Sequence, residues 1–159
     1  MAINRGKQFE NLLKEQFEKI PNISIDRLYD ITTGYKNQNN PCDFIVYKDG
    51  TLNYFECKAI HGNTLNFKSH IRENQWDKLL KKSWIPGVNA GIICWFIDLD
   101  KTYFIDIEYL DYLKEQGNKS FNAIYDIDKI PVIEIKGKKK KVFFEYELEN
   151  LLEDLSYAS

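Results

Sequence analysis

The sequence predicts an α/β fold in which helices flank a mixed central β-sheet. Two alternating apolar runs, Phe44–Tyr47 and Leu52–Phe55, surround an Asp-Gly pair, which is a strong β-hairpin signal. The continuous apolar run Gly91–Ile97 is typical of a buried central strand. Apolar residues at helical spacing come before and after these strands. A sheet covered by helices follows from these three observations.

Length and composition favour one globular domain, which we expect to span residues 1–159. The chain is 43% hydrophobic and 29% charged, which suits a packed core. Its formal net charge of -2 weakens the case for a protein that coats DNA through overall positive charge, but it leaves room for a local basic groove. The chain has no signal-peptide core and no run of membrane-spanning length. We therefore expect a protein of the reducing cytoplasm that does not bind membranes.

The three cysteines do not indicate a disulfide framework or a zinc knuckle, since their number is odd and they form no CxxC pair. A metal site built from Cys42, Cys57, His61 and His70 is an alternative with irregular spacing. The two histidines are better explained as polar loop or helix-start residues. The Cys57 side chain alternates away from its neighbours and is expected to be a buried thiol.

The first predicted helix runs from about Asn4 to Lys19, and a possible strand follows at Ile23–Tyr29. Glu10 lies on the inward stripe of that helix, three residues before Leu13. An inward acid needs a partner. Glu10 is thus either a third carboxylate aimed at a metal site or an acid at the edge of the stripe that reaches water.

The predicted hairpin places two carboxylates together. With a two-residue Asp49-Gly50 turn, Lys48 pairs with Thr51, and continuing this register puts Asp43 across from Glu56. Opposed side chains share a face, and Lys58 follows on the same face two residues later. Because opposed acids repel, a divalent cation such as Mg²⁺ or Mn²⁺ is expected between them. The lysine supplies a charge that stabilises an oxyanion or helps to activate water. The alternative is a solvated strand face with a simple Glu–Lys pair.

A second helix is predicted from about Ser69 to Lys82. Gln75 shares its inward face with Ile71 and Leu79, so the amide approaches the carboxylates or caps a backbone group. The outer face is basic. Before the hairpin, the polar stretch 32–41 has loop composition and carries Lys36, which either contacts phosphate or is solvated.

The rest of the chain adds strands and two helices. A turn at Asp98–Lys101 leads into a strand at Tyr103–Ile105. A basic run, Lys136–Lys141, is either a solvated turn or a grip on the phosphate backbone. The other expected elements are a helix at Ile107–Gln116, a strand at Val142–Phe144 and an acidic helix at Tyr146–Leu155.

The order of these signals resembles the PD-(D/E)XK nuclease superfamily, and within it the Holliday junction resolvases of the RecU and archaeal types. The matching residues are Asn4-Arg5-Gly6 with Phe9-Glu10, then Asp43, then Phe55-Glu56-Cys57-Lys58-Ala59, then Asn74-Gln75. The resemblance covers roughly the first two thirds of the chain. It implies a restriction-endonuclease-like fold.

The resemblance also implies roles for the residues of the cluster. Asp43 and Glu56 would be metal ligands, helped by the main-chain carbonyl of Cys57, and Lys58 would stabilise the transition state or orient water. Gln75 matches a family position near the metal, and Glu10 matches the helix acid of the archaeal enzymes. The expected catalytic residues are thus Asp43, Glu56, Lys58 and Glu10. The expected metal-site residues are Asp43, Glu56, Cys57 and Gln75, and the expected DNA-binding residues are Arg5, Lys7, Lys36 and Lys78.

The resemblance implies a Mg²⁺-dependent endonuclease that resolves four-way DNA junctions by paired symmetric nicks, with Mn²⁺ as a substitute. Since a junction has two-fold symmetry, a C2 homodimer is expected. The sequence departs from the RecU pattern in two places. Pro41 stands where RecU proteins have a threonine, two residues before the catalytic aspartate. The segment 21–42 is short for the projecting insertion of RecU proteins. The alternatives are another nuclease of the superfamily (restriction-like, nicking or repair) and a non-catalytic module that binds branched DNA.

Overall fold

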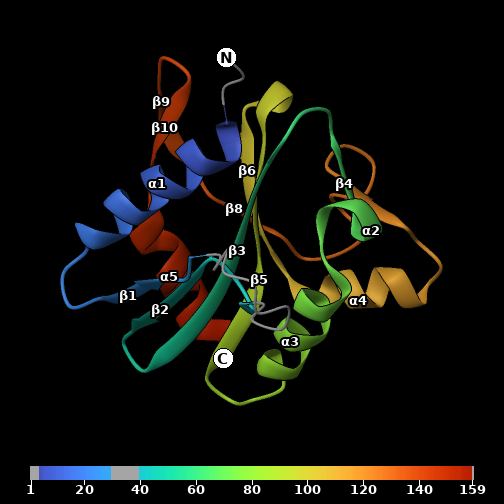
Figure 1. Ribbon diagram of the computed structural model, residues 1–159, viewed down its shortest axis with the longest axis horizontal. Helices are drawn as coiled ribbons and strands as arrows, with labels where there is room; N and C mark the ends of the chain where they lie inside the picture. The colour runs from blue at the N-terminus through green and yellow to red at the C-terminus, as the bar shows by residue number, and fades with distance from the viewer. Residues whose placement is uncertain (1–3, 30–39, 159) are drawn as a thin grey trace, which may run out of the picture.

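A mixed six-stranded β-sheet forms the centre of the molecule, a computed structural model that describes residues 4–29 and 40–158 (Figure 1). Its strands follow the order β1-β2-β3-β5-β6-β8. Only β3 and β5 are parallel; the other neighbours are antiparallel. The strand bounds are β1 (Ser24–Arg27), β2 (Phe44–Lys48), β3 (Thr51–Ile60), β5 (Val88–Phe96), β6 (Lys101–Asp106) and β8 (Ile133–Glu134).

Helices cover both faces of this sheet. They are α1 (Arg5–Glu18), α2 (Phe67–His70), α3 (Glu73–Ser83), α4 (Ile107–Glu115) and α5 (Leu148–Ala158). One apolar core lies between the sheet and α1 with α5, and a second lies between the sheet and α3 with α4. The predicted mixed sheet flanked by helices is confirmed. None of the helices in the described ranges is long and apolar enough to cross a membrane.

The strand β3 separates the two cores because its side chains alternate between the faces. Phe55 and Cys57 lie in the core under α1 and α5, where the Phe55 ring stacks on Phe17 with centroids 5.8 Å apart. Ile60 lies in the opposite core, under α3 and α4. Glu56 and Lys58 have the same parity as Ile60, so they belong to that second face.

The predicted helix over residues 69–82 is wrong in one respect, since the structure divides the segment into α2 and α3. Ile71 is extended (φ -124°, ψ 120°) and buried. The ring of His70, the last residue of α2, accepts the N–H of Asn66, the residue just before the helix, at 2.8 Å. The helix α3 then begins anew with Glu73, whose negative charge suits a helix N-terminus.

Two small sheets lie outside the main one, and the sequence patterns did not predict the strands β4, β7 and β9. The first pairs β4 (Thr64–Asn66) with β7 (Ser120–Asn122), and the second pairs β9 (Gly137–Lys140) with β10 (Phe143–Tyr146). The last helix, α5, begins at Leu148 because Tyr146 belongs to β10.

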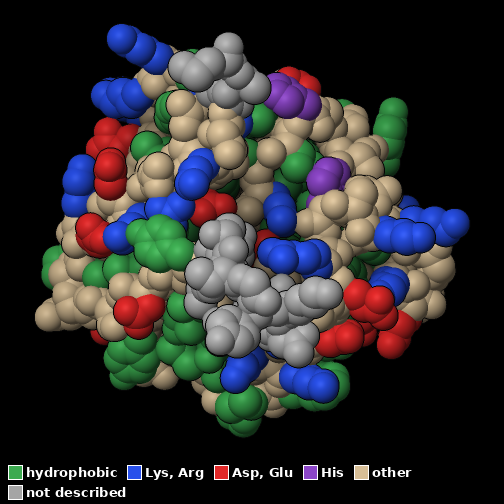
Figure 2. Space-filling model, viewed as in Figure 1, with side chains coloured by type: hydrophobic (Ala, Val, Ile, Leu, Met, Phe, Trp, Pro, Cys, Tyr) green, Lys and Arg blue, Asp and Glu red, His purple; other side chains and the backbone are tan. Residues whose placement is uncertain are grey.

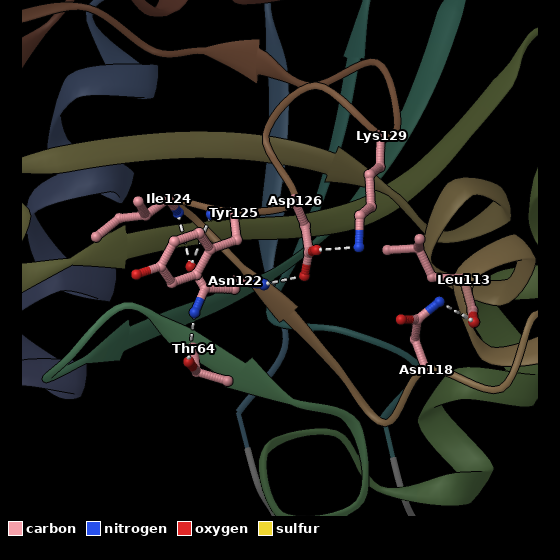
Figure 3. Close-up of polar contacts among 8 residues, drawn as sticks. All are labelled: Thr64, Leu113, Asn118, Asn122, Ile124, Tyr125, Asp126 and Lys129. Atoms are coloured by element: carbon pink, nitrogen blue, oxygen red, sulfur yellow. Dashed lines mark hydrogen bonds and ion pairs between the residues drawn. The ribbon is translucent and has the colours of Figure 1, made fainter.

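A network around Asn122 fixes the corner after β7 (Figure 3). The Asn122 side chain accepts two main-chain N–H groups, from Ile124 at 2.8 Å and Tyr125 at 3.0 Å. Its own main-chain N–H donates to Asp126 at 2.8 Å, and Asp126 also pairs with Lys129 at 2.8 Å. The neighbouring Phe121 and Ala123 are buried in the core under α4. The corner therefore closes one end of that core.

Close packing between β5 and β6 gives a test of the fold. Gly91 has no room for a side chain, since a Cβ there would collide with the main-chain oxygen of Ile105 and lie 2.8 Å from the Phe104 ring. We expect Gly91→Ala to lower the free energy of unfolding by about 1–3 kcal/mol through overpacking. Urea unfolding of the purified variant measures this loss.

Gly6→Ala is the matched control. It lies in α1, where the nearest atom to an added Cβ is 3.5 Å away. Alanine favours a helix, so this variant should be as stable as the wild type or up to about 1 kcal/mol more stable. Equal stability of the two variants would contradict the packing described for β5 and β6.

Candidate active site

The turn between β2 and β3 sets the register of the site. Asp49 and Gly50 both have positive φ (50° and 83°), as a two-residue hairpin turn requires. The observed pairs run from Lys48 with Thr51 to Phe44 with Phe55, which is the predicted register. The ladder ends there, one pair before Asp43 and Glu56.

Beyond the ladder, hydrogen bonds to neighbouring strands hold Asp43 in place. Its main-chain N–H donates to the Phe55 carbonyl at 3.0 Å, and its carbonyl accepts the Leu28 N–H at 2.8 Å. Its carboxylate accepts the Cys57 N–H at 2.8 Å, where a regular ladder would offer a carbonyl. The Asp43 side chain is therefore fixed against β3.

Glu56 and Lys58 complete the cluster on β3. The Glu56 side chain is only 4% exposed, and its Oε2 lies 3.1 Å from the Lys58 ammonium. Its Oε1 is buried and has no hydrogen-bond partner. The Lys58 side chain is 26% exposed and thus reaches the solvent edge of the site.

The carboxyl group of Asp43 lies in a buried place beside the charge of Glu56. Burial, followed by the negative charge of Glu56, raises the pKa of Asp43 to about 7, while the Cys57 N–H and the Lys58 charge oppose the shift. An ordinary surface ion pair does not produce such a pKa. This cluster matches the predicted acid, acid, lysine arrangement rather than a solvated strand face.

Glu10 approaches the same cluster from α1, but its direct partner is Arg27 on β1. The Arg27 guanidinium lies 2.9 Å from the Glu10 carboxylate and also contacts Asn11. Burial raises the pKa of Glu10, as does the charge of Asp43, while Arg27 and Lys58 lower it. Glu10 is half-buried and close enough to Asp43 and Lys58 for their charges to shift its pKa.

Sequence reasoning missed Arg27. The available signal was the rule that an inward acid needs a cation. Between Pro21 and Pro41 the chain offers only Arg27 and Lys36 as cations. The choice between them depends on the pairing of β1 with β2, which sets Arg27 opposite Phe44.

Gln75 is buried on the inward face of α3, as its spacing predicts. Its Oε1 is buried and makes no hydrogen bond. A buried amide oxygen without a partner costs free energy, so such an atom calls for an explanation. The Gln75 oxygen therefore caps no backbone group. Among the described side chains, the other buried carboxyl or amide oxygen without a partner is Oε1 of Glu56.

The alternative site of cysteines and histidines is not assembled in the structure. Cys42, Cys57 and Cys94 are buried free thiols, and the Cys57 thiol lies in the core under α1. Burial raises the pKa of all three, which keeps them protonated. His61 pairs with Asp98 at 3.1 Å on the surface. Within residues 4–29 and 40–158, no group of three or more His, Cys, Asp or Glu is arranged to hold a metal ion.

The predicted DNA-binding residues lie at separate places around the site. Arg5 and Lys7 are in the first turn of α1, and Lys78 is exposed on α3. Lys36 lies outside the described residues. Figure 2 shows Lys and Arg side chains spread over this face, several of them close to the acidic side chains near its centre.

The family model described as "RecU: Recombination protein U" matches residues 12–148, most of the chain. No curated protein matches the chain. Among solved structures, the chain is similar to Hjc of Archaeoglobus fulgidus, a Holliday junction resolvase from an archaeal hyperthermophile, with 18% identity and a TM-score of 0.46. That similarity covers 64% of this chain and 75% of that one.

The matched range includes the hairpin, Asp43, Glu56, Lys58 and Gln75, and it begins just after Glu10. The chain therefore belongs to the RecU family of Holliday junction resolvases, endonucleases that act on branched DNA in recombination.

Proposed function

We propose that this protein resolves four-way DNA junctions by Mg²⁺-dependent paired nicks, with Asp43, Glu56 and Lys58 at the reacting phosphate. The observation that carries the proposal is the buried contact of two acids beside a lysine, with Glu56 Oε1 left without a partner. Such a site is unfavourable in itself, and a hard divalent cation removes the repulsion.

The donor set fits Mg²⁺. Asp43 and Glu56 supply carboxylate oxygens, which Mg²⁺ prefers. The Cys57 N–H points to Asp43, and in a strand the carbonyl of the same residue points to the same edge. This carbonyl lies beyond the last β2–β3 pair, so it is a suitable third ligand. Mn²⁺ uses the same ligands and should substitute for Mg²⁺.

Each residue then has a role in the hydrolysis. Asp43, Glu56 and the Cys57 carbonyl would hold the cation, which would polarise the phosphate and lower the pKa of the attacking water. Lys58 places a positive charge at the solvent edge, where it stabilises the charge that develops on the phosphate oxygens. Glu10, fixed by Arg27, adds negative charge next to Asp43 and favours cation binding. Water attacks phosphorus and the bond to the 3′ oxygen breaks, which gives 5′-phosphate and 3′-hydroxyl ends.

Arg5, Lys7, Lys36 and Lys78 would bind the DNA backbone around this centre. A four-way junction is two-fold symmetric, and paired cuts need two active centres. We therefore include a C2 homodimer in the proposal, with one site in each protomer. We also propose that residues 1–159 act as a single nuclease domain.

Cleavage of a labelled four-way junction tests the function. In Mg²⁺ we expect symmetric paired nicks in the junction and not in a matched duplex, and none in EDTA. Asp43→Asn should lower the rate about 100-fold or more, because it removes a charged ligand while its side-chain oxygen still accepts the Cys57 N–H.

Other outcomes would change the assignment. Equal cutting of the duplex would indicate a restriction-like or general nuclease. Tight junction binding without cutting in any metal would leave a non-catalytic module that binds branched DNA.

The raised pKa of Asp43 gives a second test, made without metal. The group has a pKa of about 7 when folded against 3.8 as its ordinary value. Its stabilising contribution is therefore present below about pH 4 and is lost as the pH rises through 7. Asp43→Asn should unfold with a free energy about 2 kcal/mol higher than wild type at about pH 8, and the gain should shrink toward about pH 5.

Asp49→Asn is the control for this pH series. It makes the same chemical change in the exposed hairpin turn, where asparagine tolerates positive φ. Its stability should follow wild type at both pH values. A pH-independent gain for Asp43→Asn would argue against repulsion between the two carboxyl groups.

We also propose that Gln75 supports the metal site, and this role gives a third test. Loss of its amide should weaken metal binding, whereas loss of the unsatisfied oxygen should not weaken the fold. Gln75→Met keeps the shape and removes the unsatisfied oxygen, so the free energy of unfolding should stay equal or rise. The Mg²⁺ concentration for half-maximal cleavage should rise about 10-fold, as is usual when a group supporting a metal is lost.

Gln16→Met is the matched control. Gln16 bonds the main chain at Phe144 and Tyr146, at 2.9 and 2.8 Å. Its loss should lower stability and leave the Mg²⁺ dependence unchanged. An unchanged Mg²⁺ dependence in Gln75→Met would remove this residue from the metal site.

A further inference from the structure

The basic run of the sequence forms the outer part of a projecting hairpin. It covers β9 and the turn into β10, and all four residues of β9 are exposed. Gly137 starts the strand where a Cβ would lie 2.7 Å from the Glu145 carbonyl, so the strands approach closely there. The turn residue Lys141 has a φ of 58°, which is uncommon for lysine. The hairpin thus holds a row of lysines at its outer edge.

The inner strand, β10, fixes this hairpin to the body of the protein. The side chain of Gln16 on α1 bonds the main chain of β10 at two points, Phe144 and Tyr146. The Tyr146 hydroxyl lies 2.7 Å from the Thr102 hydroxyl on β6. The Phe143 ring packs on Trp95 with centroids 5.6 Å apart. The lysines are therefore presented on an anchored element.

The lysines of the hairpin differ in whether the described residues offer them an anionic partner. Lys139 pairs with Asp100 at 2.6 Å. Glu145 stands opposite Lys138 in the strand register. In the described parts of the chain no ion pair involves Lys138, Lys140 or Lys141. Lys138 and Lys140 share one face of β9, about 7 Å apart.

The hairpin lies beside the N-terminal end of α1 (Figure 1), and the Arg5 guanidinium sits 5.5 Å from the centre of the Phe143 ring. Along α1, Glu10 follows Arg5 after five residues, about 7.5 Å of helix. Lys and Arg side chains also project in Figure 2 at the upper left, where Figure 1 shows the hairpin. The lysines of the hairpin and Arg5 therefore lie near one another, at the end of α1 that precedes Glu10.

From this placement we propose that Lys138, Lys140 and Lys141 bind the phosphate backbone of a duplex arm of the DNA substrate, as a contact surface separate from the catalytic cluster. The proposal rests on the proposed function, which supplies DNA as the partner. Duplex DNA carries a negative charge every 1.7 Å or so along its axis, and lysines that neutralise it release counterions. The competing explanation is that lysines on an edge strand only prevent strand-to-strand aggregation.

The salt dependence of junction binding separates these explanations. The test variant combines Lys138→Gln, Lys140→Gln and Lys141→Asn. The control combines Lys14→Gln, Lys19→Gln and Lys119→Gln, at the other end of α1 and after α4. Both remove three positive charges from a chain of net charge -2, so long-range effects match. Binding to a labelled four-way junction is measured in EDTA over a series of salt concentrations.

Each phosphate contact contributes about 0.9 to the slope of log affinity against log salt. We expect the slope of the hairpin variant to be shallower by about 2–3 and that of the control to change by less than about 0.5. With saturating protein and Mg²⁺, the control variant should cut the junction within about twofold of the wild-type rate, since its three lysines lie outside the candidate active site and the hairpin.

Equal slopes for the two variants would overturn the proposal while wild-type cleavage still supports the proposed function. Aggregation of the hairpin variant with an unchanged slope would assign the lysines to edge protection. If the wild type itself neither binds nor cuts the junction, the proposed function fails, and the hairpin proposal fails with it.

Discussion

Two carboxyl groups, Asp43 and Glu56, are held together in a largely dry place by the hydrogen bonds of a β-hairpin. The hydrogen bond from the Cys57 N–H fixes one of them, and the burial of β3 fixes the other. Neither carboxyl group can turn away to relieve the repulsion, so positive charge close to them has to offset it. Lys58 supplies part of it from the same strand, and Arg27 compensates the further acid, Glu10. The surrounding elements are arranged around this constraint.

Local chemistry made much of the fold predictable. The Asp-Gly turn determined the hairpin register, and therefore the meeting of Asp43 with β3, from sequence alone. The helices α1 and α4 also agree with their predicted ranges to within about a turn, since each has a clear apolar stripe. The short strands β4 and β7 carry no such pattern. They form because Asn122 and its neighbours fold back on the β4 segment, which is a long-range contact.

The same distinction applies to the candidate site. Asp43, Glu56, Lys58 and Gln75 lie on elements whose periodicity gives their direction, and the structure brings the first three into one cluster. Arg27 was not predictable because nothing local relates β1 to α1. The break at Ile71 was missed because the apolar spacing continues across it, and spacing does not encode side-chain contacts such as the bond between the His70 ring and the Asn66 N–H. Metal binding and the catalytic roles stay predictions that the proposed experiments address.

The parallel pairing of β3 with β5 has a consequence for the order in which the site is assembled. Parallel strands need a crossover, and here it passes through α3, which carries Gln75. The hairpin brings Asp43, Glu56 and Lys58 together, but the cluster is buried, with Glu10 beside it, only after α1 and the crossover have docked. Such non-local assembly is slow compared with helix or hairpin formation. A nascent or partly folded chain consequently lacks the burial that raises the pKa of Asp43, so the complete cluster exists only in molecules that have finished folding.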